Sequence, residues 1–144
     1  MGCGTGRNLP GFLKSGQSVY AVDYDFDAVS TAQSLMQQNG LADKIRFAVA
    51  NPEHLPFTDN LFNEVHCIEI LHWASSTRRF EAMWMESWRV LQPGGSFFTT
   101  LRLEPEETWF IADDVLIDAL VEQCHAEQIK RTKSSLVLRK KNYL

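Results

Sequence analysis

Short apolar runs alternate along the chain with longer segments in which apolar residues recur at helical spacing. A short run bounded by turn residues is typical of a buried strand, and a recurrence every three to four positions is typical of an amphipathic helix. The pattern predicts strands at residues 18–23, 45–50, 64–70 and 96–101 and helices at residues 5–14, 27–39, 76–91 and 112–125. We therefore expect an α/β fold with a mainly parallel sheet and helices on both faces.

Two of the predicted helices have a clear apolar stripe, which is expected to face the core. The stripes contain Phe80, Met83, Trp84, Trp88 and Leu91 in the first helix and Val115, Leu116, Ala119 and Leu120 in the second. Asp27 is expected to cap the helix at residues 27–39, and Gly40 is expected to end it. The sequence Gln92-Pro93-Gly94-Gly95 is expected to form the turn before the strand at 96–101.

The last part of the chain has a different pattern. Two β-like runs, at residues 127–133 and 135–141, are separated by a single residue. This spacing is too short for a helical crossover, so the two strands are predicted to pair antiparallel. The fold class is thus a doubly wound α/β sheet with a C-terminal antiparallel β pair.

Length and charge restrict the classes of function. The 144 residues predict one domain over residues 1–144. With 14 basic and 18 acidic residues the net charge is −4, which disfavours nucleic acid as the main partner. Near the C-terminus the sequence gathers six basic residues: Lys130, Arg131, Lys133, Arg139, Lys140 and Lys141. We interpret them as charges that protect a sheet edge from aggregation.

Cysteine and hydropathy patterns indicate the compartment. Cys3, Cys67 and Cys124 are odd in number and far apart, which predicts reduced thiols in a cytoplasmic protein. No apolar run approaches the roughly 18 residues of a membrane span, and no signal peptide is recognisable. No membrane partner is therefore expected.

Three segments are candidates for a ligand site, because ligands of open α/β sheets bind outside the carboxyl ends of the strands. Gly2-Cys3-Gly4-Thr5-Gly6 stands before a predicted helix, and glycines there let a ligand approach the backbone N–H groups. Asp23 ends the next strand, where a carboxylate can accept both hydroxyls of a ribose. Residues 51–57 follow the strand predicted at residues 45–50. They offer a side-chain amide and apolar side chains that could line a pocket. Singly each is an ordinary loop; together they predict a nucleoside pocket.

The order of motifs resembles the class I S-adenosylmethionine-dependent methyltransferases, and most closely their small-molecule group. The motifs are Gly-Cys-Gly-Thr-Gly-Arg-Asn, Ala-Val-Asp, Leu-Pro-Phe-Thr-Asp-Asn-Leu-Phe, Ile-Leu-His-Trp and Arg-Val-Leu-Gln-Pro-Gly-Gly. The glycine spacing differs from the GxGxxG of dinucleotide-binding oxidoreductases, so a nicotinamide enzyme is the weaker alternative. The resemblance implies a Rossmann-like fold, S-adenosylmethionine as cofactor, S-adenosylhomocysteine as product and a small-molecule methyl acceptor.

Carried over to this sequence, the resemblance also implies a set of site residues. Those expected to bind the cofactor are Gly2, Cys3, Gly4, Gly6, Asp23, Tyr24, Asn51, Pro52, Cys67 and Ile68. His72 is the candidate general base, although a histidine at a strand end is more often a packing residue. His54, His66 and His125 show no metal-site spacing, so no metal is expected.

The sequence departs from the family pattern in three respects. Asn63 stands where the family tends to have Asp, and a structural role is expected there. Asn51 stands where the family usually has Asp, which removes a charge but keeps a hydrogen-bond acceptor. The family has a central strand before the glycine loop, whereas here Met1 directly precedes Gly2. We therefore expect an N-terminally truncated fold that lacks its first strand. The alternative hypothesis is a non-catalytic, Rossmann-like remnant with weak or no cofactor binding.

Overall fold

The computed structural model describes residues 1–13, 16–102 and 109–142. The chain divides into two compact units, Met1–Pro52 and Glu53–Leu144. The two units are described separately below. The expectation of one domain over residues 1–144 stays a prediction.

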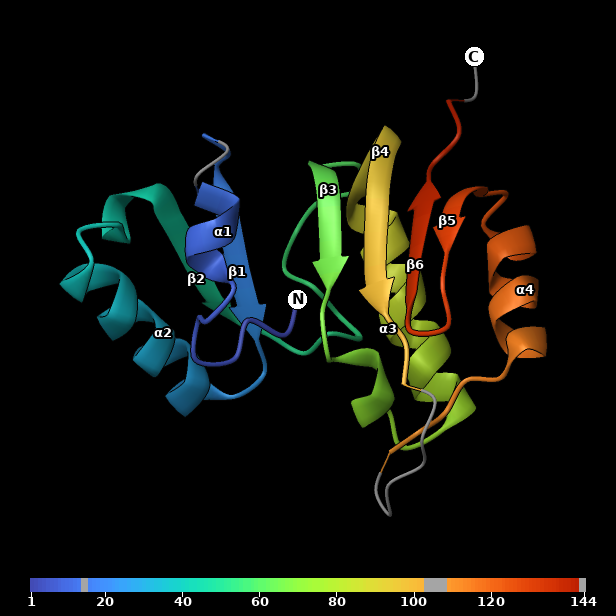
Figure 1. The fold of residues 1–144 in the computed structure, drawn as a ribbon, viewed down its shortest axis with the longest axis horizontal. Coiled ribbons are helices and arrows are strands. Elements are labelled where there is room, and N and C mark those ends of the chain that lie inside the picture. Colours follow the sequence, from blue (N-terminus) through green and yellow to red (C-terminus); the bar gives the residue numbers. More distant parts are fainter. Residues whose placement is uncertain (14–15, 103–108, 143–144) are drawn as a thin grey trace. The chain divides into compact units, whose positions relative to one another are not determined.

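The first unit contains a short parallel sheet and two helices (Figure 1). Strands β1 (Val19–Asp23) and β2 (Ile45–Val49) pair in parallel, with Asp23 opposite Val49. Helix α1 (Leu9–Leu13) precedes β1, and helix α2 (Phe26–Gln38) and the 3-10 turn η1 (Ala42–Lys44) connect the strands. The carboxyl ends of both strands therefore lie at the same edge of this sheet.

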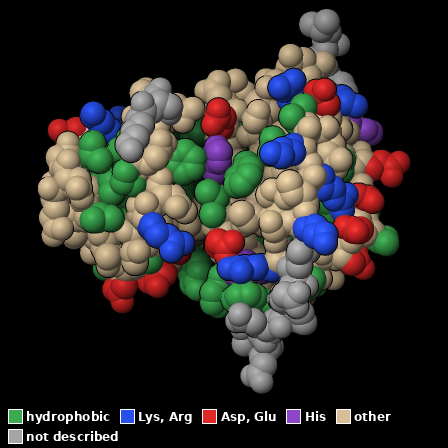
Figure 2. All heavy atoms as spheres, viewed as in Figure 1, with side chains coloured by type: hydrophobic (Ala, Val, Ile, Leu, Met, Phe, Trp, Pro, Cys, Tyr) green, Lys and Arg blue, Asp and Glu red, His purple; other side chains and the backbone are tan. Residues whose placement is uncertain are grey.

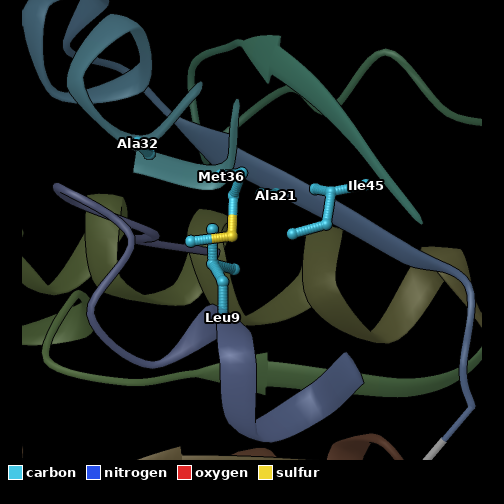
Figure 3. Close-up of a cluster of buried hydrophobic side chains, with 5 residues drawn as sticks. All are labelled: Leu9, Ala21, Ala32, Met36 and Ile45. Carbon is cyan, nitrogen blue, oxygen red and sulfur yellow. The ribbon is translucent and has the colours of Figure 1, made fainter. Parts of the chain in front are cut away.

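The core of the first unit joins all of these elements. Figure 3 shows its buried side chains, which are Leu9 from α1, Ala21 from β1, Ala32 and Met36 from α2 and Ile45 from β2. Two alanines in this set allow helix and strand backbones to approach closely. The apolar positions of the sequence thus form a real but small core.

The second unit is built on a four-stranded sheet with the order β3-β4-β6-β5 (Figure 1). Its strands are β3 (Phe62–Cys67), β4 (Leu91–Thr100), β5 (Glu127–Arg131) and β6 (Ser135–Arg139). β3 and β4 are parallel, whereas β6 is antiparallel to both β4 and β5. This confirms the predicted C-terminal antiparallel pair and places β6 between β4 and β5.

Helix α3 (Thr77–Val90) packs its apolar stripe against this sheet. Trp84 is fully buried, with its ring 5.1 Å from that of Phe97 in β4, and Trp88 is 7% exposed. Ser76 caps the helix by accepting a hydrogen bond from the Arg79 N–H. The predicted core face of this helix is confirmed.

Helix α4 (Asp114–Gln123) forms where it was predicted, but the face that it buries differs from the predicted one. Val115 is 77% exposed and Ala119 is also exposed, whereas Ile117 and Leu120 are buried. Asp113 caps the helix through the Leu116 N–H, so the helix begins two residues later than predicted. The stripe read from Val115 is therefore wrong for half of its members.

Several element boundaries also differ. The glycine loop continues as turns to Asn8, so α1 begins at Leu9, and Lys14 lies outside the described residues. Asp25, not Asp27, caps α2, because its side chain accepts from the Asp27 N–H. The turn predicted at residues 92–95 lies within β4, as an irregularity between Leu91, which pairs with Phe62 of β3, and Ser96, which pairs with Glu64.

The predicted α/β class is confirmed. Among the described strands, the pairs β1–β2 and β3–β4 are parallel, and the pairs β4–β6 and β5–β6 are antiparallel. Cys3, Cys67 and Cys124 are free cysteines, as predicted. No helix within the described ranges is long and apolar enough to cross a membrane.

Candidate functional site

The glycine loop lies directly beside the end of β1. Gly2, Gly4 and Gly6 have φ angles of 70°, 49° and 89°, a region that L-residues with a side chain rarely adopt. The Cys3 N–H donates to the Val22 carbonyl over 3.1 Å, so this segment runs along the edge of β1. The positive φ angles therefore explain why glycine is favoured at these three positions of the loop.

The glycines differ in what surrounds them. A Cβ at Gly6 would lie 3.1 Å from Ala32 Cβ and 3.2 Å from Ala32 Cα, so Gly6 allows the loop to pack under α2. A Cβ at Gly4 would meet nothing within 4 Å. Gly6 is therefore a packing residue, and Gly4 leaves backbone open for approach by a ligand.

Asp23 organises this end of the first unit. Its carboxylate accepts the Gly4 N–H at 2.8 Å through Oδ2 and the Asp25 N–H at 3.1 Å through Oδ1. The side chain is held in one orientation, and Asp23 is only 8% exposed. Because a carboxylate has about four acceptor positions, each oxygen keeps capacity for a further hydrogen bond, such as one from a ribose hydroxyl.

Other predicted cofactor residues of the first unit follow the same strand ends. Tyr24 directly follows Asp23 and is 60% exposed. The Ala50 N–H donates to the Asp23 carbonyl over 2.9 Å, which brings the segment with Asn51 and Pro52 beside the end of β1. The first unit therefore brings the glycine loop, Asp23, Tyr24, Asn51 and Pro52 to one edge of its sheet.

Cys3 lies within this group. Burial, and then the negative charge of Asp23, raise the pKa of its thiol to about 11. Cys3 is thus protonated at neutral pH and has the character of a small packing residue, not of a nucleophile.

Cys67 and Ile68 belong to the second unit, at the end of β3. The Cys67 side chain is fully buried, with Sγ 3.4 Å from Ser87 Oγ, and its carbonyl accepts the Thr99 hydroxyl at 3.1 Å. Burial raises the pKa of the Cys67 thiol. Any contact of Cys67 with a cofactor would therefore come from its backbone.

His72 lies in the 3-10 turn η2 (Leu71–Trp73), which follows β3. It is 5% exposed, and its ring lies 4.6 Å from the Trp109 ring and 5.5 Å from the Trp73 ring. The Phe110 N–H donates to the His72 carbonyl over 2.9 Å, which ties the segment after β4 to η2. Sequence reasoning found His72 but missed its aromatic partner Trp109, which is 37 residues away along the chain.

Arg89 forms a second arrangement that the sequence pattern did not predict. From the end of α3 its guanidinium donates to Glu86 and Asp59 and to the carbonyls of Leu55 and Phe57. Glu86 in turn accepts the Leu55 N–H at 2.8 Å. The motif Arg-Val-Leu-Gln-Pro-Gly-Gly thus begins with a residue that holds the loop at residues 55–59 in place.

The described residues include no group of three or more potential metal ligands. Two of the six basic residues near the C-terminus form ion pairs within the second unit: Arg131 with Asp114 and Asp118, and Arg139 with Glu127. Lys140 donates to the carbonyls of Trp88 and Leu91, and burial lowers its pKa. On the side drawn in Figure 2, acidic and basic side chains alternate around β5, β6 and α4.

Comparison with known proteins decides the family. A model of the methyltransferase domain family matches residues 1–99. The chain belongs to this family. The match includes the glycine loop, Asp23, Asn51, His72 and Arg89, so the residues discussed above lie in the part that defines the methyltransferase domain.

Relatives with known names agree with this assignment. The sterol 24-C-methyltransferase ERG6B of Gibberella zeae is 34% identical over 98 residues, which are 67% of this chain and 25% of that protein. The ubiquinone/menaquinone biosynthesis C-methyltransferase UbiE of Bartonella tribocorum is 34% identical over 109 residues, 74% of this chain and 41% of that protein. The chain therefore spans less than half the length of these curated relatives.

A solved structure shows the fold independently of sequence. A SAM-dependent methyltransferase from Methanosarcina mazei matches with a TM-score of 0.82 at 18% identity, over 98% of this chain and 90% of that one. The methyltransferase fold, Rossmann-like and α/β, is therefore shown both by the family match and by structure.

Proposed function

We propose that this methyltransferase domain transfers a methyl group from S-adenosylmethionine to a small-molecule acceptor. The observation that carries the proposal is the arrangement of the glycine loop and Asp23 inside a chain of this family. When bound, the cofactor supplies a methyl group on a sulfonium, which is already activated for displacement. The protein must then mainly bind the cofactor and the acceptor and orient them for the reaction. Such positioning can lower the activation barrier by roughly 7–11 kcal/mol.

The residues of the first unit fit a nucleoside cofactor. The buried Asp23 carboxylate is oriented by two backbone N–H groups and can accept ribose hydroxyls. The Gly4 backbone is open for approach, and the exposed ring of Tyr24 is available to stack on an adenine. Asn51 and Pro52 are proposed beside the adenine edge, and the backbone of Cys67 and Ile68 beside the methionyl part.

His72 is proposed as the proton acceptor for an acceptor molecule that must lose a proton. Its location after β3, at the carboxyl end of that strand, supports this role. The acceptor class is proposed from the names of the relatives, which refer to sterols and to ubiquinone or menaquinone. The three free cysteines support a cytoplasmic location.

A calorimetric titration with S-adenosylhomocysteine tests the cofactor proposal. We expect micromolar binding by the purified chain and about 10- to 100-fold weaker binding by Asp23→Asn, because a charge-assisted hydrogen bond is worth roughly 1.5–3 kcal/mol. Asp27→Asn is the matched control, since it removes the same charge from an exposed position in the first turn of α2.

Folding must be measured on the same samples by circular dichroism. Cooperative melting of the wild-type chain without binding would reject the proposal and favour the non-catalytic remnant. If Asp23→Asn and Asp27→Asn bind S-adenosylhomocysteine equally well, only the role of Asp23 is rejected, and the cofactor proposal itself stands. His72→Gln is expected to bind S-adenosylhomocysteine as the wild-type chain does.

A further inference from the structure

The carboxyl ends of β3 and β4 carry an aromatic and acidic cluster that the cofactor proposal does not use. The rings of Trp73 and Trp109 lie 6.3 Å apart at 64°, and Trp73 is 52% exposed. Glu69 lies on the chain between β3 and η2, where it forms an ion pair with Arg102. All four residues belong to the second unit.

The cluster already holds a cation. The Arg102 guanidinium carbon lies 4.8 Å above the Trp109 ring while its nitrogen donates to Glu69. An aromatic face with a carboxylate beside it is the environment that proteins use for organic cations. Arg102 therefore demonstrates, with a side chain of the protein itself, which kind of group this environment accepts.

Arg102 is held weakly. Its contacts with other described residues are one ion pair and one ring contact, and its side chain is 41% exposed. Exposed ion pairs of this kind are worth about 0–1 kcal/mol. A ligand cation can therefore replace Arg102 at low cost.

Glu69, by contrast, is fixed. It has a positive φ of 56°, and its N–H donates to Thr100 Oγ1 over 2.7 Å. A non-glycine residue in this conformation costs about 1–3 kcal/mol and is kept only where the surroundings impose it. The hydrogen bond to β4 is such a constraint, and it fixes the Glu69 backbone, from which the side chain extends, at the ends of the two strands.

The charge of Glu69 favours a cation over an anion. Its carboxylate pairs with the Arg102 guanidinium that lies over the Trp109 ring. A cation is attracted to this negative charge, whereas an anionic ligand would have to approach it.

We infer that Glu69, Trp73 and Trp109 form a cation site that takes an ammonium group of the methyl acceptor, and that Arg102 is the chain's own occupant of that site. This inference rests on the proposed methyltransferase function. It predicts an acceptor that carries a positively charged amine or quaternary ammonium group, which is a different class from the sterols and quinones in the relatives' names.

The test compares three probes of similar shape: choline, its uncharged isostere 3,3-dimethyl-1-butanol and the anion 3,3-dimethylbutanoate. Binding is followed through the indole N–H resonances of the 15N-labelled full chain, assigned with single Trp→Phe variants. We expect choline to shift the resonances of Trp73 and Trp109 and to leave those of the buried Trp84 and Trp88 unchanged. The other two probes are expected to have no effect at the same concentration.

Two variants then separate the cation site from an anion site. Arg102→Ala should bind choline about two- to fivefold more tightly, because it removes a competing cation whose ring contact is worth about 0.5–1 kcal/mol. Glu69→Gln should bind choline about fivefold more weakly or worse, because the counter-charge is lost. Arg78→Ala, which removes an exposed positive charge from α3, is the matched control and should behave as wild type.

Three results would overturn the inference: no shift with choline, weaker choline binding by Arg102→Ala, or binding of 3,3-dimethylbutanoate that disappears in Arg102→Ala. The second would indicate that Arg102 supports the site and does not compete for it, and the third would indicate an anion site on Arg102. S-adenosylhomocysteine binding is measured on the same samples. Loss of choline binding with retained S-adenosylhomocysteine binding rejects only the cation site, and the reverse pattern rejects only the cofactor proposal.

Discussion

Gly4 and Gly6 share a left-handed backbone conformation but differ in what an added side chain would meet. Gly6→Ala would press a Cβ against the Ala32 backbone, so we expect a loss of several kcal/mol in unfolding free energy. In Gly4→Ala the added Cβ meets only open space. We expect this variant to lose about 1–2 kcal/mol in unfolding free energy, because alanine is disfavoured in a left-handed backbone conformation. Its binding of S-adenosylhomocysteine should nevertheless be at least tenfold weaker, because the new methyl group occupies the ligand's approach.

Urea denaturation and calorimetric titration of both variants check this prediction. Gly11→Ala is the control, since Gly11 lies in α1 without a positive φ and without neighbours within 4 Å of an added Cβ. It should be neutral or slightly stabilising. Unchanged S-adenosylhomocysteine binding by Gly4→Ala would contradict the role given to the open backbone.

The three thiols make a second prediction at the residue scale. Burial raises the pKa of Cys3 to about 11 and also raises those of Cys67 and Cys124. Since only the thiolate is alkylated, the native protein should react slowly with iodoacetamide at about pH 8 and rapidly in urea. Mass spectrometry of the labelled chain measures this. Rapid labelling of Cys3 in the folded protein would mean that the glycine loop does not protect it.

The positions of single residues were predicted best where local backbone conformation or chemistry restricts the type of residue. The glycine loop and Asp23 lie together at the end of β1, as expected, because closely spaced glycines and an acid at a strand end leave a clear pattern; their binding of the cofactor stays a prediction. Trp109 was missed because its contact with His72 depends on how the segment after β4 folds back to η2. No short-range pattern records such a contact.

At the scale of elements, Arg89 connects the end of α3 to the loop at residues 55–59. Arg89→Met keeps the apolar stem but leaves two carbonyls and Glu86 without their donor. We expect a loss of about 2–4 kcal/mol in unfolding free energy, which urea denaturation measures. Arg78→Met on the exposed part of the same helix is the control and should change stability by less than about 0.5 kcal/mol. A similar effect of both variants would contradict the proposed role of the network.

The same network predicts a pH dependence. The hydrogen bond from Arg89 lowers the pKa of Glu86 below its ordinary value of 4.5. A carboxyl with a lowered pKa stabilises the fold above its ordinary pKa and loses that contribution as the pH falls through the lowered value. Wild type should therefore lose more unfolding free energy between about pH 6 and pH 3 than Glu86→Gln does. Glu122→Gln, exposed on α4, should follow the wild-type curve.

Elements were predicted well in kind and less well in their ends. The apolar stripe of α3 was read correctly because Trp84 and Trp88 are large and regularly spaced. The stripe of α4 was read one residue out of phase, since this helix is apolar over much of its surface and burial selects Ile117 over Val115. Residues 92–95 read as a turn from their glycines, but they lie within β4, where Gly94 and Gly95 form backbone hydrogen bonds with Lys140. In both cases long-range packing decides between local alternatives.

At the scale of the whole molecule, the two compact units differ greatly in the core that each buries. The first unit has a two-stranded sheet and the small core of Figure 3, whereas the second has four strands and large buried rings such as Trp84, Phe80 and Phe97. A two-stranded sheet is marginal on its own. We therefore expect the first unit to unfold at lower denaturant concentration than the second.

The distribution of tryptophan makes this difference measurable. All four tryptophans, Trp73, Trp84, Trp88 and Trp109, lie in the second unit, so their fluorescence reports on that unit alone, while far-ultraviolet circular dichroism reports on both. In urea the circular dichroism signal should begin to fall before the fluorescence changes. S-adenosylhomocysteine at about 100 times its Kd should stabilise the first unit by about 2.7 kcal/mol and bring the two curves together. The Asp23→Asn variant should not show this convergence at the same ligand concentration. Coincident curves without ligand would contradict the prediction and would support the single domain expected from the length of the chain.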